Sequence, residues 1–254
     1  MKRLTVLLVT VLLATGCGSD LFLPTPDPAV RYFAFGDSST AGPSSRDYPD
    51  ALRELLDAPP ETFVNEGNGG ETATEGLDRL RRLIDNEIYP NAAVFLYWES
   101  GNDIADFIGQ TDPFLLVSPD SPDYPFNTEL TTALDDIQTA IESALQAARD
   151  DGMTTYIATY FALAPGVTDC SALPFNIALP LQTDHADVYI ERLNARIRLA
   201  AAARGATLVD IASFSGSLQA DLNNYFNCNH LSASGNEIVA RIFQTIVVPV
   251  PPIP

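Results

Sequence analysis

Apolar runs typical of buried strands alternate along the chain with segments whose apolar residues recur at helical spacing. Five runs predict strands, at residues 31–35, 62–65, 92–98, 154–160 and 207–211. Five segments predict helices, at residues 49–58, 74–88, 128–150, 186–204 and 232–247. The proline- and aspartate-rich stretch 109–126 predicts a surface loop. Because the run 92–98 is almost continuously apolar, we expect a sheet covered by helices on both faces.

This alternation predicts an α/β fold with a central parallel sheet of five strands. Right-handed crossovers leave few topologies for such a sheet. Ligands of open parallel sheets bind at the carboxyl ends of the strands. The residues that follow each predicted strand are therefore the first candidates for a functional site.

Polar clusters follow three of these strands, and a fourth precedes the last helix. They lie at residues 36–40, 65–72, 100–103 and 227–232. Each cluster alone has an ordinary structural explanation. In chain order, these are a Gly-Asp-Ser turn, a glycine-rich loop, a helix cap at Asn102 and a surface histidine at His230. Together, and in this order, they are far more specific.

Ser38, in the first cluster, is a candidate nucleophile. A serine hydroxyl attacks poorly until a base removes its proton, so Ser38 needs a neutral imidazole nearby. The chain has two histidines, His185 and His230. His185 lies at a predicted helix start, where we expect a solvated or capping role, so His230 is the preferred base.

The four clusters resemble the conserved blocks of the SGNH/GDSL hydrolase family over residues 31 to about 247. The resemblance implies that Ser38 is the nucleophile and that His230 is the general base. It also implies an oxyanion hole formed by the N–H of Ser38, the N–H of Gly70 and the side-chain amide of Asn102. The fold it implies is a three-layer, flavodoxin-like fold.

Two positions depart from the family pattern. Ser100 stands where glycine is usual, a mild change if the turn uses Gly101. Asn227 stands where an aspartate usually orients the base. An amide oxygen can accept the imidazole N–H but supplies no charge, and the opposite amide orientation favours the wrong tautomer. Asn227 is thus an uncertain third member, and Asp221 or a backbone carbonyl are alternatives.

The N-terminus resembles a bacterial lipoprotein signal. Two basic residues precede an apolar stretch, residues 4–14, that is too short to span a bilayer. The resemblance implies a signal peptide at 1–16 and lipid attachment to Cys17, and an ordinary cleaved signal peptide is the alternative. Residues 17–30 then form a proline-rich tether, 31–248 the hydrolase domain and 249–254 a proline-rich tail. We expect the bacterial cell envelope, as a lipid-anchored outer-membrane or periplasmic protein, or secretion.

Cysteine use fits an oxidising compartment. If Cys17 carries lipid, Cys170 and Cys228 remain as an even pair, which predicts a disulfide. Two buried free thiols are the alternative. Two distant cysteines lack the spacing of a zinc site, so no metal is expected.

Charge narrows the possible partners. The chain has 14 Lys and Arg against 33 Asp and Glu, a formal net charge of -19, which argues against nucleic-acid binding. We expect a monomer without cofactor that contacts the membrane only through its N-terminal lipid.

The sequence therefore predicts a serine ester hydrolase that forms an acyl-enzyme on Ser38. Its substrate is a small-molecule, lipid or glycan ester. The alternatives are a binding lipoprotein that has lost catalysis and an acyltransferase that uses the same site. The stretches 109–126 and 170–182 either wall an acyl pocket or only cover the core.

Overall fold

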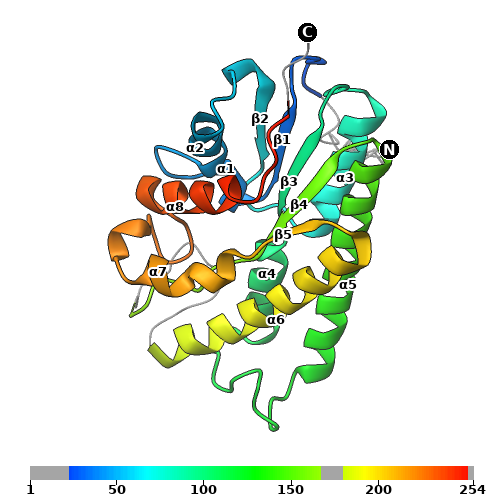
Figure 1. Cartoon of the computed structure of the whole chain (residues 1–254). Coiled ribbons are helices and arrows are strands. Elements are labelled where there is room, and N and C mark those ends of the chain that lie inside the picture. Colours follow the sequence, from blue (N-terminus) through cyan, green and yellow to red (C-terminus); the bar gives the residue numbers. More distant parts are fainter. Residues whose placement is uncertain (1–22, 167–179, 251–254) are drawn as a thin grey trace, which may run out of the picture.

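The computed structural model describes residues 23–166 and 180–250, which form a five-stranded parallel sheet with helices on both faces (Figure 1). The strand order is β2-β1-β3-β4-β5. The strands are β1 Tyr32–Gly36, β2 Phe63–Gly67, β3 Val94–Trp98, β4 Thr154–Ala158 and β5 Thr207–Val209. The predicted α/β class and parallel five-stranded sheet are confirmed.

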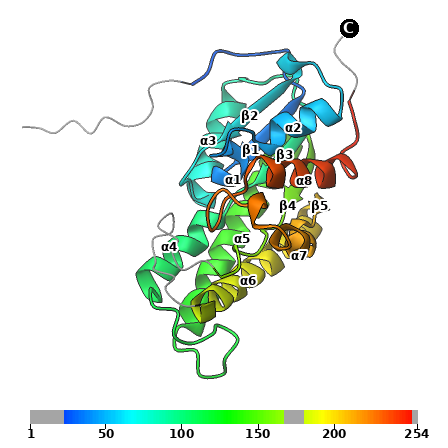
Figure 2. The ribbon, with the colours of Figure 1, turned by 90° about the vertical axis from the view of Figure 1, so that its left-hand side faces the viewer.

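Helices cover the two faces of the sheet unequally (Figure 2). One face carries α2 Tyr48–Leu55 and α8 Ala233–Gln244, which pack against each other. The other carries α3 Ala73–Asp85, α5 Asn127–Asp150 and α6 Pro180–Arg204, with α5 in the middle. Shorter helices lie at the carboxyl edge: α1 Ser38–Ala41, α4 Gly101–Thr111, α7 Ser215–Gln219 and the 3-10 turns Ile211–Phe214 and Leu222–Asn224. A further 3-10 turn, Pro60–Thr62, precedes β2.

The central strands owe their composition to this double cover. All five residues of β1 and all five of β3 are buried, as the continuous apolar run at 92–98 predicted. Aromatic rings fill the space between these strands and α3, with the rings of Phe33 and Phe95 5.4 Å apart. The capping box of Thr72 and Glu75 fixes the start of α3, so its apolar stripe faces this layer.

The strand order creates a crevice between β1 and β3. Strands β2 and β3 lie on opposite sides of β1, so the connection that follows β1 and the one that follows β3 run in opposite directions. The two connections therefore diverge at the carboxyl ends of β1 and β3. Ser38 follows β1 directly, and Asn102 lies in the first turn after β3. The fold thus brings the first and third polar clusters to one crevice.

Several predicted boundaries were wrong. Helix α4 was not predicted, and the loop expected from residue 109 begins after Thr111. Helix α6 starts at Pro180 and not at residue 186, because proline is tolerated in a first helical turn. The end of the predicted tether contacts the domain, since Val30 is buried and the N–H of Asp27 donates to the carbonyl of Ile88 (2.7 Å).

The predicted signal peptide and Cys17 lie outside the described residues. Within 23–166 and 180–250, no helix combines the length and apolar content needed to cross a bilayer.

Candidate active site

Ser38 occupies the first position of α1, immediately after β1. Asp37 caps this helix by accepting the N–H of Ser39 (2.8 Å). As a first-turn residue, Ser38 has a backbone N–H without an intrahelical acceptor. The cap and the strand end therefore present both the hydroxyl and the N–H of Ser38 at the crevice.

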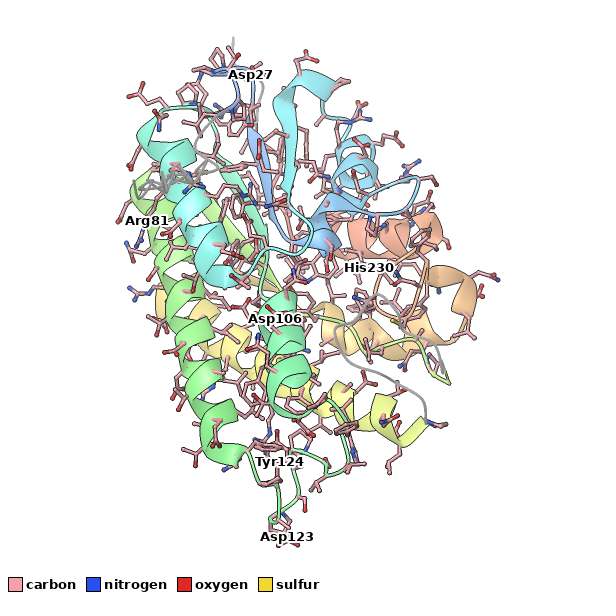
Figure 3. All side chains as sticks on the ribbon, turned by 180° about the vertical axis from the view of Figure 1, so that it is seen from behind. Asp27, Arg81, Asp106, Asp123, Tyr124 and His230 are labelled. Atoms are coloured by element: carbon pink, nitrogen blue, oxygen red, sulfur yellow. The ribbon has the colours of Figure 1, made fainter. Side chains whose placement is uncertain are left out.

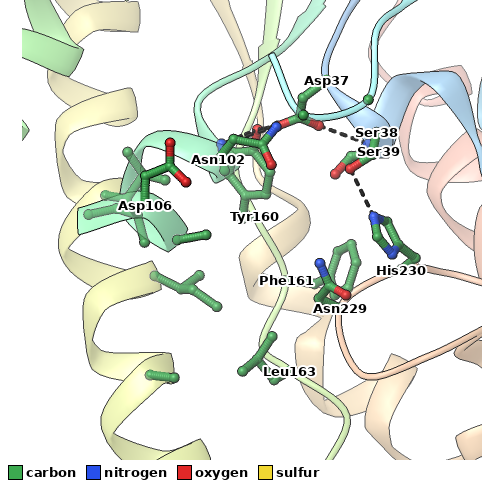
Figure 4. Close-up of a pocket in the computed structure, with 18 of the residues that line it drawn as sticks. Asp37, Ser38, Ser39, Asn102, Asp106, Tyr160, Phe161, Leu163, Asn229 and His230 are labelled. Atoms are coloured by element: carbon green, nitrogen blue, oxygen red, sulfur yellow. Dashed lines mark hydrogen bonds between the residues drawn. The ribbon is translucent and has the colours of Figure 1, made fainter. Parts of the chain in front are cut away.

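His230 reaches Ser38 from a tight loop before α8. The isolated antiparallel bridge between Tyr225 and Leu231 closes this loop, and the N–H of Phe226 donates to the carbonyl of His230 (2.9 Å). The Nε2 atom of His230 lies 2.8 Å from Ser38 Oγ (Figure 4). Two residues 192 positions apart in sequence thus form a nucleophile–base pair in hydrogen-bond contact.

Asn227 fixes the tautomer of His230. Its Oδ1 accepts the backbone N–H groups of His230 (2.8 Å) and Asn229 (3.1 Å), which orients the amide. The same oxygen lies 3.1 Å from His230 Nδ1, so Nδ1 carries the proton and Nε2 accepts from the Ser38 hydroxyl. Asp221, the alternative partner, instead accepts the N–H of Asn223 (3.0 Å).

Burial keeps His230 neutral. Desolvation lowers the pKa of its imidazole below the ordinary value of 6.5, because the charged form is less stable away from water. A neutral imidazole is the form that can accept the serine proton. Asn227 adds no negative charge that would oppose this shift.

Gly70 and Asn102 line the same cavity as Ser38 and His230. Gly70 has φ +89°, a conformation that favours glycine, and a side chain at neighbouring Gly69 would come within 3.7 Å of Ser38 Cβ. Asn102 Nδ2 donates to the carbonyl of Glu71 (2.9 Å), which leaves its second hydrogen for another acceptor. The structure therefore brings together all the residues that the sequence assigned to the oxyanion hole.

Tyr160, which the sequence analysis missed, joins three of these strand ends. Its hydroxyl donates to Asp37 Oδ2 (2.6 Å) and accepts the N–H of Gly101 (2.8 Å). A side chain at Gly101 would lie 2.8 Å from the Tyr160 ring, so only glycine fits. Burial raises the pKa of Asp37, while these donors favour its charged form. Its place two residues beyond β4 was the only available signal.

The turn before α4 uses Ser100 and not Gly101, so the condition under which serine at this position would be a mild change is not met. Ser100 has φ +109° and is fully buried. Its hydroxyl makes no hydrogen bond to any described residue. The strained conformation therefore falls on a non-glycine residue, at a cost of about 1 to 3 kcal/mol.

Buried carboxylates support the second loop. Arg79 Nε donates to Glu71 Oε1 (2.8 Å), and Asp103 Oδ2 accepts the N–H of Ala73 (2.8 Å) at the start of α3. Burial raises the pKa of Asp103 to about 7. These contacts hold the glycine-rich loop against α4.

The cavity at this site has a volume of about 600 Å³. Its described walls come from α4, α6 and the segment after β4, and none of the residues that line it belongs to the loop 112–126. Figure 3 shows Asp123 and Tyr124 of that loop at the end of the molecule far from His230. Residues 170–179 lie outside the described residues.

Two further sequence candidates are located as follows. The Nδ1 atom of His185 lies 2.7 Å from the carbonyl oxygen of Leu115, so His185 bridges α6 to a loop and is neither a cap nor part of the site.

Cys228 is buried, and its carbonyl accepts the N–H of Ala164 (2.9 Å). Its expected partner Cys170 lies outside the described residues, so the disulfide stays a prediction.

Comparison with known proteins agrees with this geometry. A lipolytic G-D-S-L family protein from Veillonella parvula matches with TM-score 0.56 at 15% identity, covering 86% of this chain and 98% of its own. A putative acylhydrolase from Bacteroides fragilis matches with TM-score 0.56 at 20% identity, covering 88% and 89%. An acetyl xylan esterase matches with TM-score 0.54 at 20% identity, covering 86% and 100%. At these identities the likeness shows the fold.

The family assignment rests on the sequence itself. No curated protein matches the chain. Residues 34–238, which run from within β1 to within α8 and include the loop of His230, match the GDSL-like lipase/acylhydrolase family. The chain is therefore an ester-hydrolysing enzyme that belongs to the GDSL-like lipase/acylhydrolase family.

Proposed function

We propose that this protein hydrolyses carboxylic esters through a covalent acyl-enzyme on Ser38. The observation that carries the proposal is the 2.8 Å contact between Ser38 Oγ and His230 Nε2, with Asn227 on the other ring nitrogen. This arrangement of nucleophile, base and orienting group is the geometry that serine catalysis requires.

In the acylation step, His230 Nε2 takes the hydroxyl proton as Ser38 Oγ attacks the ester carbonyl. The carbonyl oxygen becomes an oxyanion, which the N–H groups of Ser38 and Gly70 and the amide of Asn102 stabilise. Each such donor contributes about 10²- to 10³-fold in rate. As the tetrahedral intermediate collapses, His230 gives its proton to the leaving alcohol.

Deacylation repeats these steps with water. His230 removes a proton from water, the hydroxide attacks the acyl-enzyme, and the same donors stabilise the second oxyanion. The acid product leaves and the proton returns to Ser38. An alcohol in place of water would give acyl transfer, and product analysis with alcohol acceptors separates the two reactions.

Asn227 orients His230 in both steps without stabilising it electrostatically. The amide oxygen keeps Nδ1 protonated and the ring aimed at Ser38, but it supplies no charge when the imidazolium forms. We therefore expect an active enzyme whose base works without a carboxylate.

Hydrolysis of nitrophenyl esters from acetyl to octanoyl tests the proposal directly. Ser38→Ala and His230→Ala should each lower kcat/KM by about 10³-fold or more, because each removes one half of the nucleophile–base pair. His185→Ala is the matched control and should keep wild-type activity, since its ring binds Leu115 away from the site. Wild-type turnover in Ser38→Ala, or an inactive wild type, would refute the proposal.

A further inference from the structure

The cavity at Ser38 has a second, apolar part. Beyond the polar residues at the catalytic end, its walls are aliphatic and aromatic. They are Ile104, Ala105 and Ile108 on α4, Ala186, Ile190 and Leu193 on α6, and Phe161 and Leu163 after β4. Figure 4 shows Phe161 and Leu163 below the pair of Ser38 and His230. We call this part of the cavity, with these eight residues, the apolar arm.

The direction of the apolar arm follows from its two helices. Helix α4 begins beside Asp37 and Tyr160, so its first turn is the catalytic end. On α6 the catalytic end lies near Leu193, because the next residue, Asn194, bonds both backbone groups of Tyr160 (2.7 and 2.8 Å). The apolar arm therefore extends along both helices, away from the carboxyl edge of the sheet.

Helix geometry gives the length of the arm. Ile108 lies six residues beyond Asn102 on α4, a rise of about 9 Å, and Ala186 lies seven residues before Leu193 on α6, about 10 Å. The rings of Phe107 and Tyr189 join the helices, with centroids 6.1 Å apart. With carbon–carbon bonds of about 1.5 Å, an extended chain of about eight carbons spans this length.

The side chains of the eight residues that form the arm carry no hydrogen-bonding group. Ile104, Ile108 and Leu193 are buried hydrocarbon side chains, so a water molecule or a sugar hydroxyl packed against them would find no hydrogen-bond partner among these eight side chains. A saturated acyl chain would bury its methylene groups against the same walls, each worth about 0.8 kcal/mol. The chemistry of the walls therefore selects an aliphatic chain.

Charge near the arm disfavours an anionic substrate. Asp106 lines the cavity and is exposed, and it lies one helical turn beyond Asn102, so the two side chains are neighbours on the helix surface. The described lining residues include no lysine or arginine. A phosphate or carboxylate on the substrate would meet repulsion without a compensating partner.

We infer that the substrates are neutral esters whose acyl part is a saturated chain of about eight carbons, lying between α4 and α6. The inference rests on the proposed function and specifies the substrate class of the same site. In this account Ala105, Ile108 and Ile190 determine how long an acyl chain the enzyme accepts.

The test is a series of nitrophenyl esters from acetyl to dodecanoyl. For the wild type, kcat/KM should rise by up to about fourfold per methylene to octanoyl and then level off, the factor that 0.8 kcal/mol gives. The monoester of octanedioic acid, of equal length with a terminal carboxylate, should react at least about a hundredfold more slowly than octanoyl. A flat series, or one that peaks at acetyl, would overturn the inference.

Ala105→Phe tests the position of the chain. Ala105 is half-buried one turn beyond Asn102, so a larger side chain is tolerated there and fills the arm. The ratio of octanoyl to acetyl kcat/KM should fall at least tenfold. The matched control is Ala195→Phe, since Ala195 is exposed on α6 and does not line the cavity. An unchanged ratio in a folded Ala105→Phe protein contradicts the placement.

Ligand binding by Ser38→Ala separates this inference from the proposed function. This variant lacks the nucleophile, so methyl octanoate should raise its melting temperature above the effect of methyl acetate. If the wild type hydrolyses no ester but this shift appears, the proposed function fails and the acyl site stands. If esters are hydrolysed without chain preference and no shift appears, the acyl site fails alone.

Discussion

Replacing Asn227 with aspartate adds one charge beside the base and leaves its hydrogen bonds in place. The Oδ1 atom accepts two backbone N–H groups and faces His230 Nδ1 at 3.1 Å, and a carboxylate oxygen can do the same. The amide nitrogen of Asn227 donates to no described residue, so its replacement by oxygen breaks no recorded bond. The perturbation is therefore almost purely electrostatic.

The magnitude follows from the distance. A carboxylate and an imidazolium about 4 Å apart attract by about 1 kcal/mol in water and about 4 kcal/mol at a surface-like dielectric. The pKa of His230 should therefore rise by about 1 to 3 units from its burial-lowered value. The same attraction stabilises the imidazolium in the transition state, so kcat/KM above the new pKa should increase at least about tenfold.

The assay is the pH profile of kcat/KM for the wild type and Asn227→Asp on one nitrophenyl ester. Because the base acts in its neutral form, kcat/KM of the wild type should drop to half its maximum only at a pH below 6.5. In Asn227→Asp this acid limb of the profile moves to higher pH, so the gain in kcat/KM is largest in alkali and disappears in acid, where the free enzyme already carries the imidazolium. Asn227→Ala should lose activity, since nothing then orients the ring. An unmoved acid limb in Asn227→Asp, or an unchanged profile in Asn227→Ala, would refute the role of Asn227.

Three further predictions concern stability and the loop of the base. Ser100→Gly removes a positive φ and an unpaired buried hydroxyl, so the free energy of unfolding in urea should rise by about 1 to 2 kcal/mol, and an unchanged or lower value would contradict the strain. Burial raises the pKa of Asp103 to about 7, so the native state binds its proton more tightly than the unfolded state and stability falls as pH rises from about 4 to about 7. Asp103→Asn should remove up to about 4 kcal/mol of this pH dependence, measured by urea unfolding at pH 4 and 8, and a dependence equal to that of wild type would count against it. Cys170 and Cys228 should form a disulfide, worth about 4 kcal/mol, whose reduction lowers both melting temperature and activity; two alkylatable thiols in native, oxidised protein would exclude it.

The sequence predicted the site well because of a rule of parallel sheets. The carboxyl ends of neighbouring strands meet at one edge, so residues after β1, β2 and β3 had to come together. That rule brings the polar clusters that contain Ser38, Gly70 and Asn102 to one edge of the sheet, whereas the choice of Gly70 and Asn102 within their clusters came from the family resemblance. The preference for His230 over His185 came instead from the place of His185 at a predicted helix start, and in the structure His185 lies on α6 and contacts the carbonyl oxygen of Leu115.

What the sequence did not predict depends on contacts between distant residues. Tyr160 contacts Asp37 across 123 positions, and the ring of Tyr160 leaves no room for a side chain at Gly101. The positive φ of Ser100 has no signal in the sequence, because serine does not favour that conformation. Helix α4 was missed because its first residues are polar and glycine-rich and its end merges into a proline-rich loop. Because this helix was missed, its contribution to the cavity wall was not predicted. Of the two alternatives left open for 109–126, the described lining residues favour the one in which this stretch only covers the core.

The most direct test of the central claim, that His230 activates Ser38 as a nucleophile, is labelling with a fluorophosphonate followed by peptide mapping. The reagent forms a stable bond only with an activated serine, so it reports the pair without assuming any substrate. We predict that the wild type is labelled on Ser38 alone, that His230→Ala is labelled about 10³-fold more slowly, and that Ser38→Ala is not labelled. Absence of labelling in folded wild-type protein, or labelling on another serine, would contradict the account.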